Sequence, residues 1–411
     1  HGRLRPGLRS LDRRLVVLPV MRILLAAPAL ILLGLAVRAV VGAQTLPEGC
    51  IATGPDGRFL CWQAAAPPPT LPPAATATAA PAPTSTPVIP PTNFSFTLGP
   101  EQAMYVELSL IHIPDAHISH VWQGNEMRQF ISAGVSGYRF TGPNADSLTL
   151  NPTTPVIKPG PLPNEYKAFG SVIPGPNGEL FGYYHAESCG RGNYTATVGA
   201  AVSVDGGLTW SDKGNVITGY QANQSCTKSR PSGAGQPSVI RIGTFVYVYY
   251  TQWGGGYPDT IHVARANYAD AVMPGAFTKW RSGNWNGIGL GGQSSSVIPS
   301  VLDTFAANAS VSWNTYLQKY ITVFDASKGF YLVTSKDGVT WDTPRLVFAY
   351  PKPHNQRTTG DVIFNYPSLA SPDEATSETT SKTGWLYYAK GIVGGTPHEM
   401  FRAPFSLEAM P

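Results

Sequence analysis

Two acidic side chains and one histidine stand where predicted β-strands end. His185 and Glu187 follow the aromatic run at residues 180–184, and Asp325 follows a second such run at residues 320–324. Because side chains alternate along a strand, His185 and Glu187 share one face. Two carboxyls, one of them protonated to donate to a leaving oxygen, can hydrolyse a glycosidic bond. We therefore expect Glu187 to act as general acid and Asp325 as base or nucleophile, with His185 holding the pKa of the acid or binding a hydroxyl.

Structural roles remain open for each of these three residues. Glu187 could be a surface-loop acid beside Cys189, Asp325 could begin a turn, and His185 could be a hydrogen-bonded core residue. We expect further side chains at the same site. Glu107 would be a third acid, and Trp253 and Tyr366 would be stacking platforms. The hydroxyl-binding groups would be Gln236, Asn308, Asn314 and Lys390.

Two repeated motifs indicate which elements position these side chains. Ser203-Val-Asp205-Gly-Gly207-Leu-Thr209-Trp210 recurs at residues 335–341, with weaker copies at 146–150 and 276–280. The threonines of the four copies are 60, 69 and 62 residues apart. A second series of five serines has spacings of 62, 67, 72 and 58 residues, and its members are Ser109, Ser171, Ser238, Ser310 and Ser368. Two independent series with one period indicate a repeat architecture.

Each repeat holds about four runs of strand type and length, rich in aromatic and β-branched residues. Five such units over residues 105–407 predict an all-β protein, a five-bladed β-propeller of four-stranded antiparallel blades. The serine series marks the innermost strands, and their first residues should face a central pocket. Those residues are Glu107, Phe169, Gln236, Asn308 and Tyr366. The second strand of each blade returns to the same side, which would bring His185, Glu187 and Asp325 there.

The motif at residues 203–210 resembles the Asp-box of sialidases and other propeller glycosidases. Five blades resemble the arabinanase, xylosidase and invertase-like glycosidases instead. The resemblance implies that the box residues Asp205 and Asp337 are structural, accepting hydrogen bonds from turn N–H groups and from Ser and Thr hydroxyls. Gly207 and Gly338 would supply a positive φ, and the box tryptophans Trp210 and Trp341 would pack between sheets.

The chain departs from the five-bladed glycosidases at two of their acidic positions, where Phe169 and Gln236 stand. It also lacks the Phe-Arg-Ile-Pro motif of sialidases, although Arg139, Arg191, Arg265 and Arg281 could supply a carboxylate clamp. We expect a glycoside hydrolase acting on a neutral poly- or oligosaccharide. A non-catalytic carbohydrate-binding or cell-surface propeller and a sialidase-like enzyme stay open. Some relatives hold a central Ca²⁺, but no ligand set for it is legible, and no cofactor is expected.

Composition and charge exclude several other classes. The 411 residues are 13% charged and 11% aromatic, with 43 Gly and 38 Pro, which is typical of a turn-rich β-protein rather than a helical one. Coiled coils, helical bundles and acidic disordered proteins are excluded. Residues 1–43 carry a charge of +6 and residues 44–411 carry −2. A near-neutral body has no electrostatic footprint for nucleic acid.

Composition also indicates how the chain is divided into segments. Residues 1–43 read as a leader with a signal peptide starting at Met21 and cleaved after Ala43, or as an uncleaved membrane anchor over about residues 15–43. Residues 44–63 form a small hairpin stapled by Cys50 and Cys61, residues 64–92 form a linker rich in Pro, Ala and Thr, and residues 93–411 form the body. Cys189 would pair with Cys226, and no Cys/His spacing resembles a zinc site. A secreted or surface-tethered monomer is expected.

Overall fold

The computed structural model describes residues 50–52, 59–61, 93–106, 108, 110–160, 165–220, 224–227, 230–254, 259–298, 305–395 and 397–410. The chain divides into two compact units, residues 1–84 and residues 85–411. The expected leader (1–43), the expected linker (64–92) and Glu107 lie outside the described residues. In the first unit, β1 (Cys50–Ala52) pairs antiparallel with β2 (Phe59–Cys61), with Cys50 opposite Cys61. The disulfide between these two cysteines stays a prediction.

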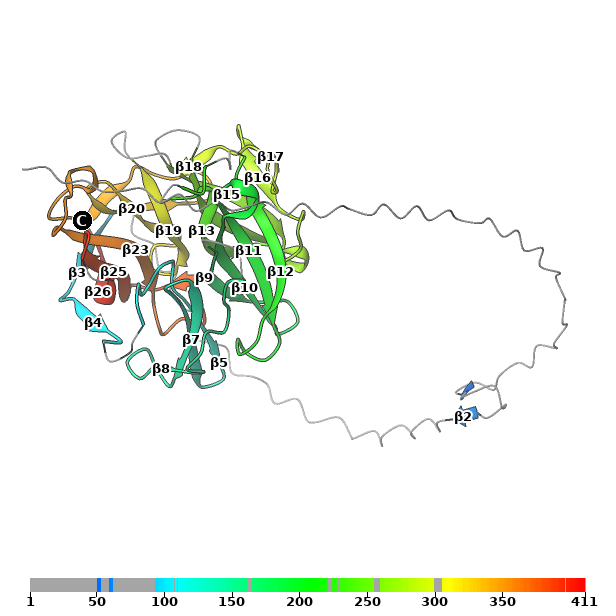
Figure 1. Cartoon of the computed structure of the whole chain (residues 1–411). Coiled ribbons are helices and arrows are strands. Elements are labelled where there is room, and N and C mark those ends of the chain that lie inside the picture. The colour runs from blue at the N-terminus through cyan, green and yellow to red at the C-terminus, as the bar shows by residue number, and fades with distance from the viewer. Residues whose placement is uncertain are drawn as a thin grey trace, which may run out of the picture. The chain divides into compact units, whose positions relative to one another are not determined.

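The second unit consists of β-strands and three short 3₁₀ turns, and no α-helix occurs among its described residues, so the all-β prediction is confirmed. Its antiparallel pairings divide the strands into five groups along the chain (Figure 1), and short parallel pairings join the first three groups into one 14-stranded sheet. The first two groups are β5 (Ser119–Gln123), β6 (Glu126–Ala133), β7 (Ser136–Gly142) and β8 (Thr149–Leu150), then β9 (Tyr166–Pro174), β10 (Leu180–Ser188), β11 (Thr195–Ser203) and β12 (Ser211–Thr218). The third is β13 (Ser232–Ile242), β14 (Phe245–Trp253), β15 (Thr260–Asn267), β16 (Thr278–Arg281), β17 (Asn284–Ile288) and β18 (Ser296–Ile298).

The fourth group is β19 (Ala306–Asn314), β20 (Lys319–Ala326), β21 (Gly329–Ser335) and β22 (Arg345–Ala349), with β24 (Thr379–Thr380) pairing parallel to β19. The fifth is β23 (Val362–Ala370), β25 (Thr383–Ile392) and β26 (Glu399–Ala409), completed by the N-terminal strands β3 (Phe94–Leu98) and β4 (Gln102–Met104), which both pair with β26. The 3₁₀ turns are η1 (Gly190–Gly192), η2 (Tyr268–Asp270) and η3 (His354–Gln356). The contribution of β3 and β4 to the last group was not foreseen from the sequence.

The hydrophobic core lies between successive groups rather than in one central mass. Tyr183 of the second group packs with Phe277 of the third, and further clusters join the third group to the fourth and the fourth to the fifth. The last two clusters join the fifth group to the first and the first to the second. Because every group buries side chains against both of its neighbours, the five groups form a cycle.

A cycle of serine hydroxyls joins the first strands of the five groups. Each hydroxyl accepts a backbone N–H from the first strand of the next group. The bonds run from Val172 to Ser119, Val239 to Ser171, Val311 to Ser238, Leu369 to Ser310 and Ile118 to Ser368, at 2.9–3.1 Å. The sequence series identified four of these serines but placed the first at Ser109, which lies outside the described residues. The structure assigns that position to Ser119, and the first strand of the first group therefore begins ten residues later than expected.

The two turns at residues 203–210 and 335–341 make the predicted hydrogen bonds. Asp205 accepts from Ser203 Oγ (2.8 Å), Thr209 Oγ1 (2.5 Å) and the backbone N–H groups of Leu208 and Thr209 (3.1 and 3.0 Å). Burial acts to raise the pKa of Asp205, but these hydrogen bonds outweigh it and lower the pKa to about 2. Asp337 is bonded in the same way. Both acids therefore make the hydrogen bonds that the structural interpretation predicts, and that interpretation stays a prediction.

Asp205→Ala is expected to destabilise the second unit by about 1–3 kcal/mol, because the turn loses all of these bonds. The bonds of Asp205 stay within its own turn, so the specific activity of the folded fraction should not change. Thermal unfolding followed by circular dichroism measures the first effect. Glu399→Ala, at another exposed acid, serves as the control. Lost activity at unchanged melting temperature would mean that Asp205 is a functional acid.

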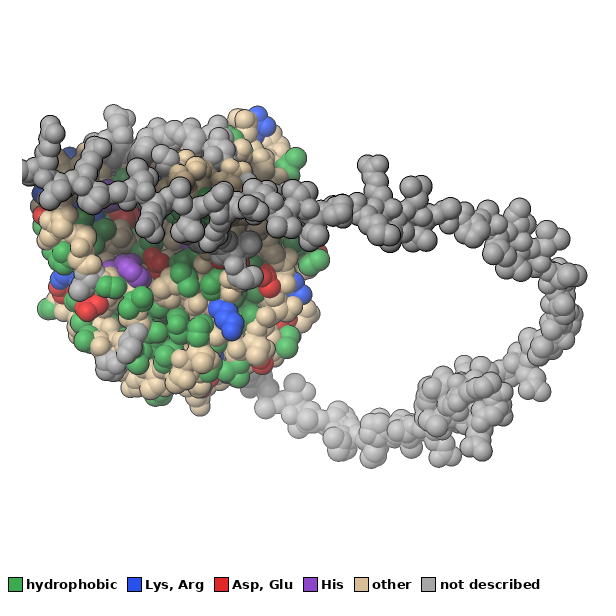
Figure 2. Space-filling model, in the orientation of Figure 1, with side chains coloured by type: hydrophobic (Ala, Val, Ile, Leu, Met, Phe, Trp, Pro, Cys, Tyr) green, Lys and Arg blue, Asp and Glu red, His purple; other side chains and the backbone are tan. Residues whose placement is uncertain are grey.

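Charged side chains on the face shown in Figure 2 are scattered among apolar and uncharged ones, and the basic groups do not form a stripe. Within the described parts of the chain, no helix is both long and apolar enough to span a bilayer.

Candidate active site

Three first strands carry the same local distortion just before their serines. The pairing register shifts between Gly235 and Ser238, and again at the matching points of β19 and β23, so each strand bulges by one extra residue. Gln236, Asn308 and Tyr366 occupy these bulges with positive φ values of 53°, 55° and 56°. All three side chains line one cavity, which places them where the sequence predicted.

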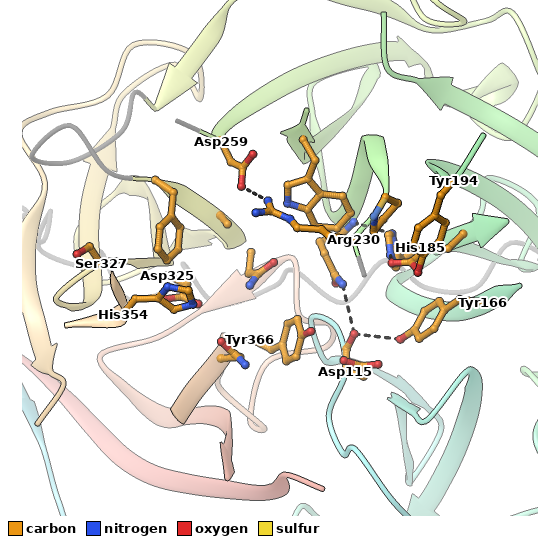
Figure 3. Close-up of a pocket in the computed structure, with 18 of the residues that line it drawn as sticks. Asp115, Tyr166, His185, Tyr194, Arg230, Asp259, Asp325, Ser327, His354 and Tyr366 are labelled. Carbon is orange, nitrogen blue, oxygen red and sulfur yellow. Dashed lines mark hydrogen bonds and ion pairs between the residues drawn. The ribbon is translucent and has the colours of Figure 1, made fainter. Parts of the chain in front are cut away.

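This cavity has a volume of about 780 Å³, within the usual range for small-ligand sites. Its walls come from all five strand groups and their connections. Besides the three bulge residues, the residues that line it include Asp115, Tyr166, His185, Glu187, Tyr194, Arg230, Trp253, Asp259, Phe305, Asp325 and His354. Tyr366 lies between Asp325 and His354 on one side and Asp115 on the other (Figure 3).

Glu187 is held by two donors on the wall formed by β10 and the start of β11. His185 Nε2 is 2.9 Å from Glu187 Oε1, and the Tyr194 hydroxyl donates to Oε2. The backbone N–H of Gln236 points at His185 Nδ1 (3.3 Å), so Nδ1 accepts and Nε2 carries the proton donated to Glu187. Burial acts to raise the pKa of Glu187, but the bonds from His185 and Tyr194 outweigh it and the net shift is downward. Glu187 is therefore an ionised carboxylate near neutral pH.

Asp115 is the acid that the sequence analysis missed. It precedes β5, and its backbone carbonyl accepts from Tyr166 Oη (3.0 Å) and Gln236 Nε2 (3.3 Å). Burial raises the pKa of its carboxyl to about 7, a donor hydroxyl from Tyr366 opposes this, and the negative charge of Glu187 adds to the rise. Asp115 consequently holds its proton at pH values where Glu187 has lost its own.

Asp325 lies on the opposite side of the cavity, on β20. It is 2% exposed and accepts a hydrogen bond from the Tyr350 hydroxyl at 2.6 Å. Burial raises its pKa to about 7, although the bond from Tyr350 and the charge of Arg357 act in the opposite direction. The structure therefore brings Asp325, Glu187 and His185 to one cavity, and it keeps Asp325 protonated where Glu187 is ionised.

Aromatic side chains and one ion pair complete the walls. The rings of Tyr166 and Trp253 lie 5.1 and 5.2 Å from the ring of His185. Gly235 is required beside them, because a Cβ there would collide with His185 Nδ1. Arg230 forms an ion pair with Asp259 and lies over the ring of Trp253.

The predicted disulfide between Cys189 and Cys226 is present. Cys189 follows β10 two residues after Glu187, and Cys226 lies four residues before Arg230. The loop that carries Cys226 also holds the backbone of Tyr194, the residue whose hydroxyl donates to Glu187. The N–H of Tyr194 donates to Gln224 O of that loop at 2.8 Å. The disulfide therefore ties together two loops that both carry cavity residues.

Three predicted positions do not line the cavity. Asn314 ends β19 at the opposite end from Asn308, and it bonds Thr380 Oγ1 and the N–H of Leu317. Lys390 pairs with Glu101, because the alternation of side chains turns it to the other face from its strand neighbour Ala389. Phe169 is fully buried against Trp210. Glu107 lies outside the described residues.

The residues that sequence reasoning missed have weak individual signals. Asp115 stands four residues before Ser119, whereas Gln236, Asn308 and Tyr366 stand two residues before their serines. Even a serine series with the correct first member would therefore have pointed to His117 instead of Asp115. Tyr166, Tyr194, Arg230, Asp259 and His354 lie at strand ends or in loops and belong to no repeat. Among the described residues lining the cavity, Arg230 is the one arginine, and Asp259 neutralises it. No cluster of three or more His, Cys, Asp or Glu that could hold a metal ion occurs in the described parts of the chain.

The arrangement resembles solved structures in fold. Zg3597, a family 117 glycoside hydrolase from the marine bacterium Zobellia galactanivorans, matches with a TM-score of 0.50 and 13% identity over 77% of this chain and 90% of that chain. An α-L-arabinofuranosidase from Lactobacillus brevis matches with a TM-score of 0.46 and 10% identity over 72% and 91%. An α-L-arabinanase from Penicillium chrysogenum matches at 0.45 and 10% over 75% and 96%. No protein-family model matches the sequence, and no curated protein matches it. The likeness to Zg3597 shows a shared β-propeller-like fold.

Proposed function

We propose that this chain is an exported glycoside hydrolase whose second unit is a five-bladed β-propeller, and that it cleaves a neutral poly- or oligosaccharide in the cavity around Tyr366. The cycle of serine bonds and the five core clusters support five blades. The observation that carries the chemistry is the opposite protonation of two carboxyls that interact electrostatically. Glu187 is ionised, and its charge helps to keep Asp115 protonated. A glycosidase needs this combination of one acid and one base.

In this proposal Asp115 gives its proton to the leaving oxygen as the glycosidic C–O bond breaks. Glu187 takes a proton from the water that attacks the anomeric carbon. Both Glu187 oxygens already accept hydrogen bonds from protein groups, and each keeps a lone pair that can accept from water. In this proposal the free lone pairs accept from the attacking water and do not form a covalent bond to the anomeric carbon. The roles differ from the sequence expectation, in which Glu187 was the acid and Asp325 the base.

The remaining cavity residues fit a neutral sugar. Trp253 and Tyr366 offer ring faces on which a sugar can stack, and Asn308 offers an amide for hydroxyls. Arg230 is paired with Asp259, and the ionised Glu187 adds a negative charge to the cavity, which disfavours a sialic acid or another anionic sugar. Asp325, neutral below about pH 7, can donate a hydrogen bond to a substrate hydroxyl. The protein would act outside the cytoplasm as a monomer, with no cofactor.

A non-catalytic carbohydrate-binding role is the second candidate, and the hydrogen bonds that hold both Glu187 oxygens to His185 and Tyr194 favour it. The test is hydrolysis of a panel of p-nitrophenyl pentosides and hexosides and of neutral oligosaccharides by the purified chain, with product analysis. We expect cleavage that is fastest near pH 5–6 and falls as pH rises through about 7, because Asp115 then loses its proton. Sugar binding by calorimetry without any product would select the non-catalytic role.

A further inference from the structure

Asp115 stands in the connection before β5 rather than in a strand, so strand pairing does not fix its position. Its own backbone is held from the first three strand groups. The N–H of Asp115 donates to Ser132 Oγ at 2.9 Å, and its carbonyl accepts from Tyr166 and Gln236. The residue just before it, Pro114, is held instead from the fifth group, by a side chain that does not line the cavity.

That side chain belongs to His398, which stands between β25 and β26. Its Nε2 is 2.8 Å from the carbonyl oxygen of Pro114, and its own backbone carbonyl accepts the N–H of Ile113 at 3.2 Å. Because a carbonyl oxygen can only accept, Nε2 carries the hydrogen. His398 therefore binds the two residues before the acid with one donor and one acceptor.

The imidazole of His398 also lies beside the acidic side chain itself. Its Nε2 is 4.0 Å from Asp115 Oδ1, which is too long for a hydrogen bond but places the ring next to the carboxyl. The ring also packs against Tyr366, with 5.9 Å between centroids, and Tyr366 is the residue whose hydroxyl donates to Asp115. Burial and the charge of His112 lower the pKa of His398 to about 4, although the bond to Pro114 acts in the opposite direction. Between about pH 4 and pH 7 the ring is therefore neutral while Asp115 holds its proton.

A glycine in the neighbouring strand makes room for His398. A Cβ on Gly391 of β25 would stand 2.8 Å from His398 Cβ and 3.0 Å from its Cα, closer than packed side chains come. Glycine inside a strand often marks such a close approach of another chain segment. The place of His398, which is 13% exposed, is consequently set by packing against β25 as well as by its two bonds to residues 113–114.

We propose that His398 is a positioning residue for Asp115: it fixes the backbone of residues 113–114 so that the Asp115 carboxyl reaches the leaving oxygen. A misplacement of about 1 Å can cost about 10²-fold in rate, even when it starts far from the reacting atoms. The inference rests on the proposed function in taking Asp115 as the proton donor. It adds that the fifth strand group contributes to catalysis through a residue that does not touch the sugar.

The experiment compares two substitutions of His398 in the full chain on two classes of substrate. His398→Met removes the donor, whereas His398→Gln keeps an N–H donor on a side chain of similar reach. We expect His398→Met to lower kcat on alkyl glycosides by about 10–100-fold, with KM and the turnover of 2,4-dinitrophenyl glycosides within about threefold of the wild type. The dinitrophenyl leaving group needs no proton, so the position of the donor does not affect its departure. His398→Gln should recover most of the lost kcat.

His120→Met is the matched control. The Nε2 of His120 also bonds a backbone carbonyl, that of Glu374 at 3.1 Å, and burial likewise lowers the pKa of His120 to about 4. Its side-chain bonds go to Glu374 and Ser377, which do not line the cavity. His120→Met should lower the melting temperature and leave the ratio of alkyl to dinitrophenyl turnover unchanged. A general loss of stability therefore has a different signature from a displaced proton donor.

Gly391→Ala tests the inference even where His398→Met does not fold. The added Cβ leaves the imidazole in place as a donor but pushes on the backbone that carries it, so the same selective loss on alkyl glycosides is expected.

Three results overturn the inference: full turnover of alkyl glycosides in the folded His398→Met variant, an equal loss on both substrate classes, or no recovery in His398→Gln. Any of these, with an active wild type and an Asp115→Asn variant that loses only alkyl glycosides, would reject the role of His398 alone. Absence of hydrolysis by the wild type would reject the proposed function and the inference together.

Discussion

Glu187→Gln is expected to lower kcat/KM for glycoside hydrolysis by about 10³-fold or more, while the chain stays folded and still binds sugar. The amide keeps the length of the side chain and its Oε1 can still accept from His185, but it cannot take a proton from water. The loss should persist on substrates with activated leaving groups, such as 2,4-dinitrophenyl glycosides, because the missing step concerns the nucleophile.

Asp115→Asn provides the comparison that separates the two roles. If Asp115 is the proton donor, the variant should lose turnover on alkyl glycosides but retain much of it on 2,4-dinitrophenyl glycosides, whose leaving group needs no protonation. Glu126→Gln is the control for a carboxyl-to-amide change, since Glu126 pairs with Arg128 on the surface. Rescue of Glu187→Gln rather than Asp115→Asn by the activated leaving group would restore the original assignment of Glu187 as the acid. Undiminished hydrolysis in both variants would remove the pair from the mechanism.

The repeat series show how far the sequence could lead. Ser171, Ser238, Ser310 and Ser368 fall in the first strands of four groups, and this register correctly brought Gln236, Asn308 and Tyr366 to one cavity. The register locates the cavity because equivalent positions of the first strands lie at the same depth in every group. It failed in the first group, where Ser109 in a Leu-Ser-Leu context imitates the pattern better than Ser119. Asp115 lies outside the register in either case, because it precedes Ser119 by four residues and the other cavity residues precede their serines by two.

Other parts of the site depend on features that a one-dimensional pattern does not carry. The direction of Lys390 follows from alternation, but only once the pairing of Asn365 with Ala389 is known. The protonation of Asp325 depends on burial beside Tyr350, 25 residues away in sequence. Protonation states are set by neighbours from different strands, and for that reason the roles of the acids changed while their location did not.

Asp325→Asn is expected to stabilise the protein at alkaline pH. The pKa of Asp325 is raised from 3.8 to about 7 by burial, so between these values the folded chain holds a proton that the unfolded chain has released. The free energy of unfolding therefore falls as pH rises from about 4 to about 7, by up to about 4 kcal/mol from this group alone. The amide keeps an acceptor for the Tyr350 hydroxyl and removes the charge. The variant should match the wild type near pH 4 and unfold at a higher temperature at pH 8.

Asp212→Asn is the control with the opposite sign. Asp212 also accepts from a tyrosine hydroxyl, Tyr184 at 2.5 Å, but it is paired with Lys167. Burial acts to raise its pKa, and the bonds from Lys167 and Tyr184 lower it overall, so its stabilising effect is present above pH 3.8 and is lost as pH falls. Asp212→Asn should accordingly be less stable than the wild type at pH 8. Calorimetric melting temperatures from pH 4 to pH 8 test both variants, and a pH-independent difference for Asp325→Asn would show that its carboxyl ionises as freely in the folded chain as in the unfolded one. A stabilised variant with weakened turnover would mean that the buried acid is retained for the cavity at a cost in stability.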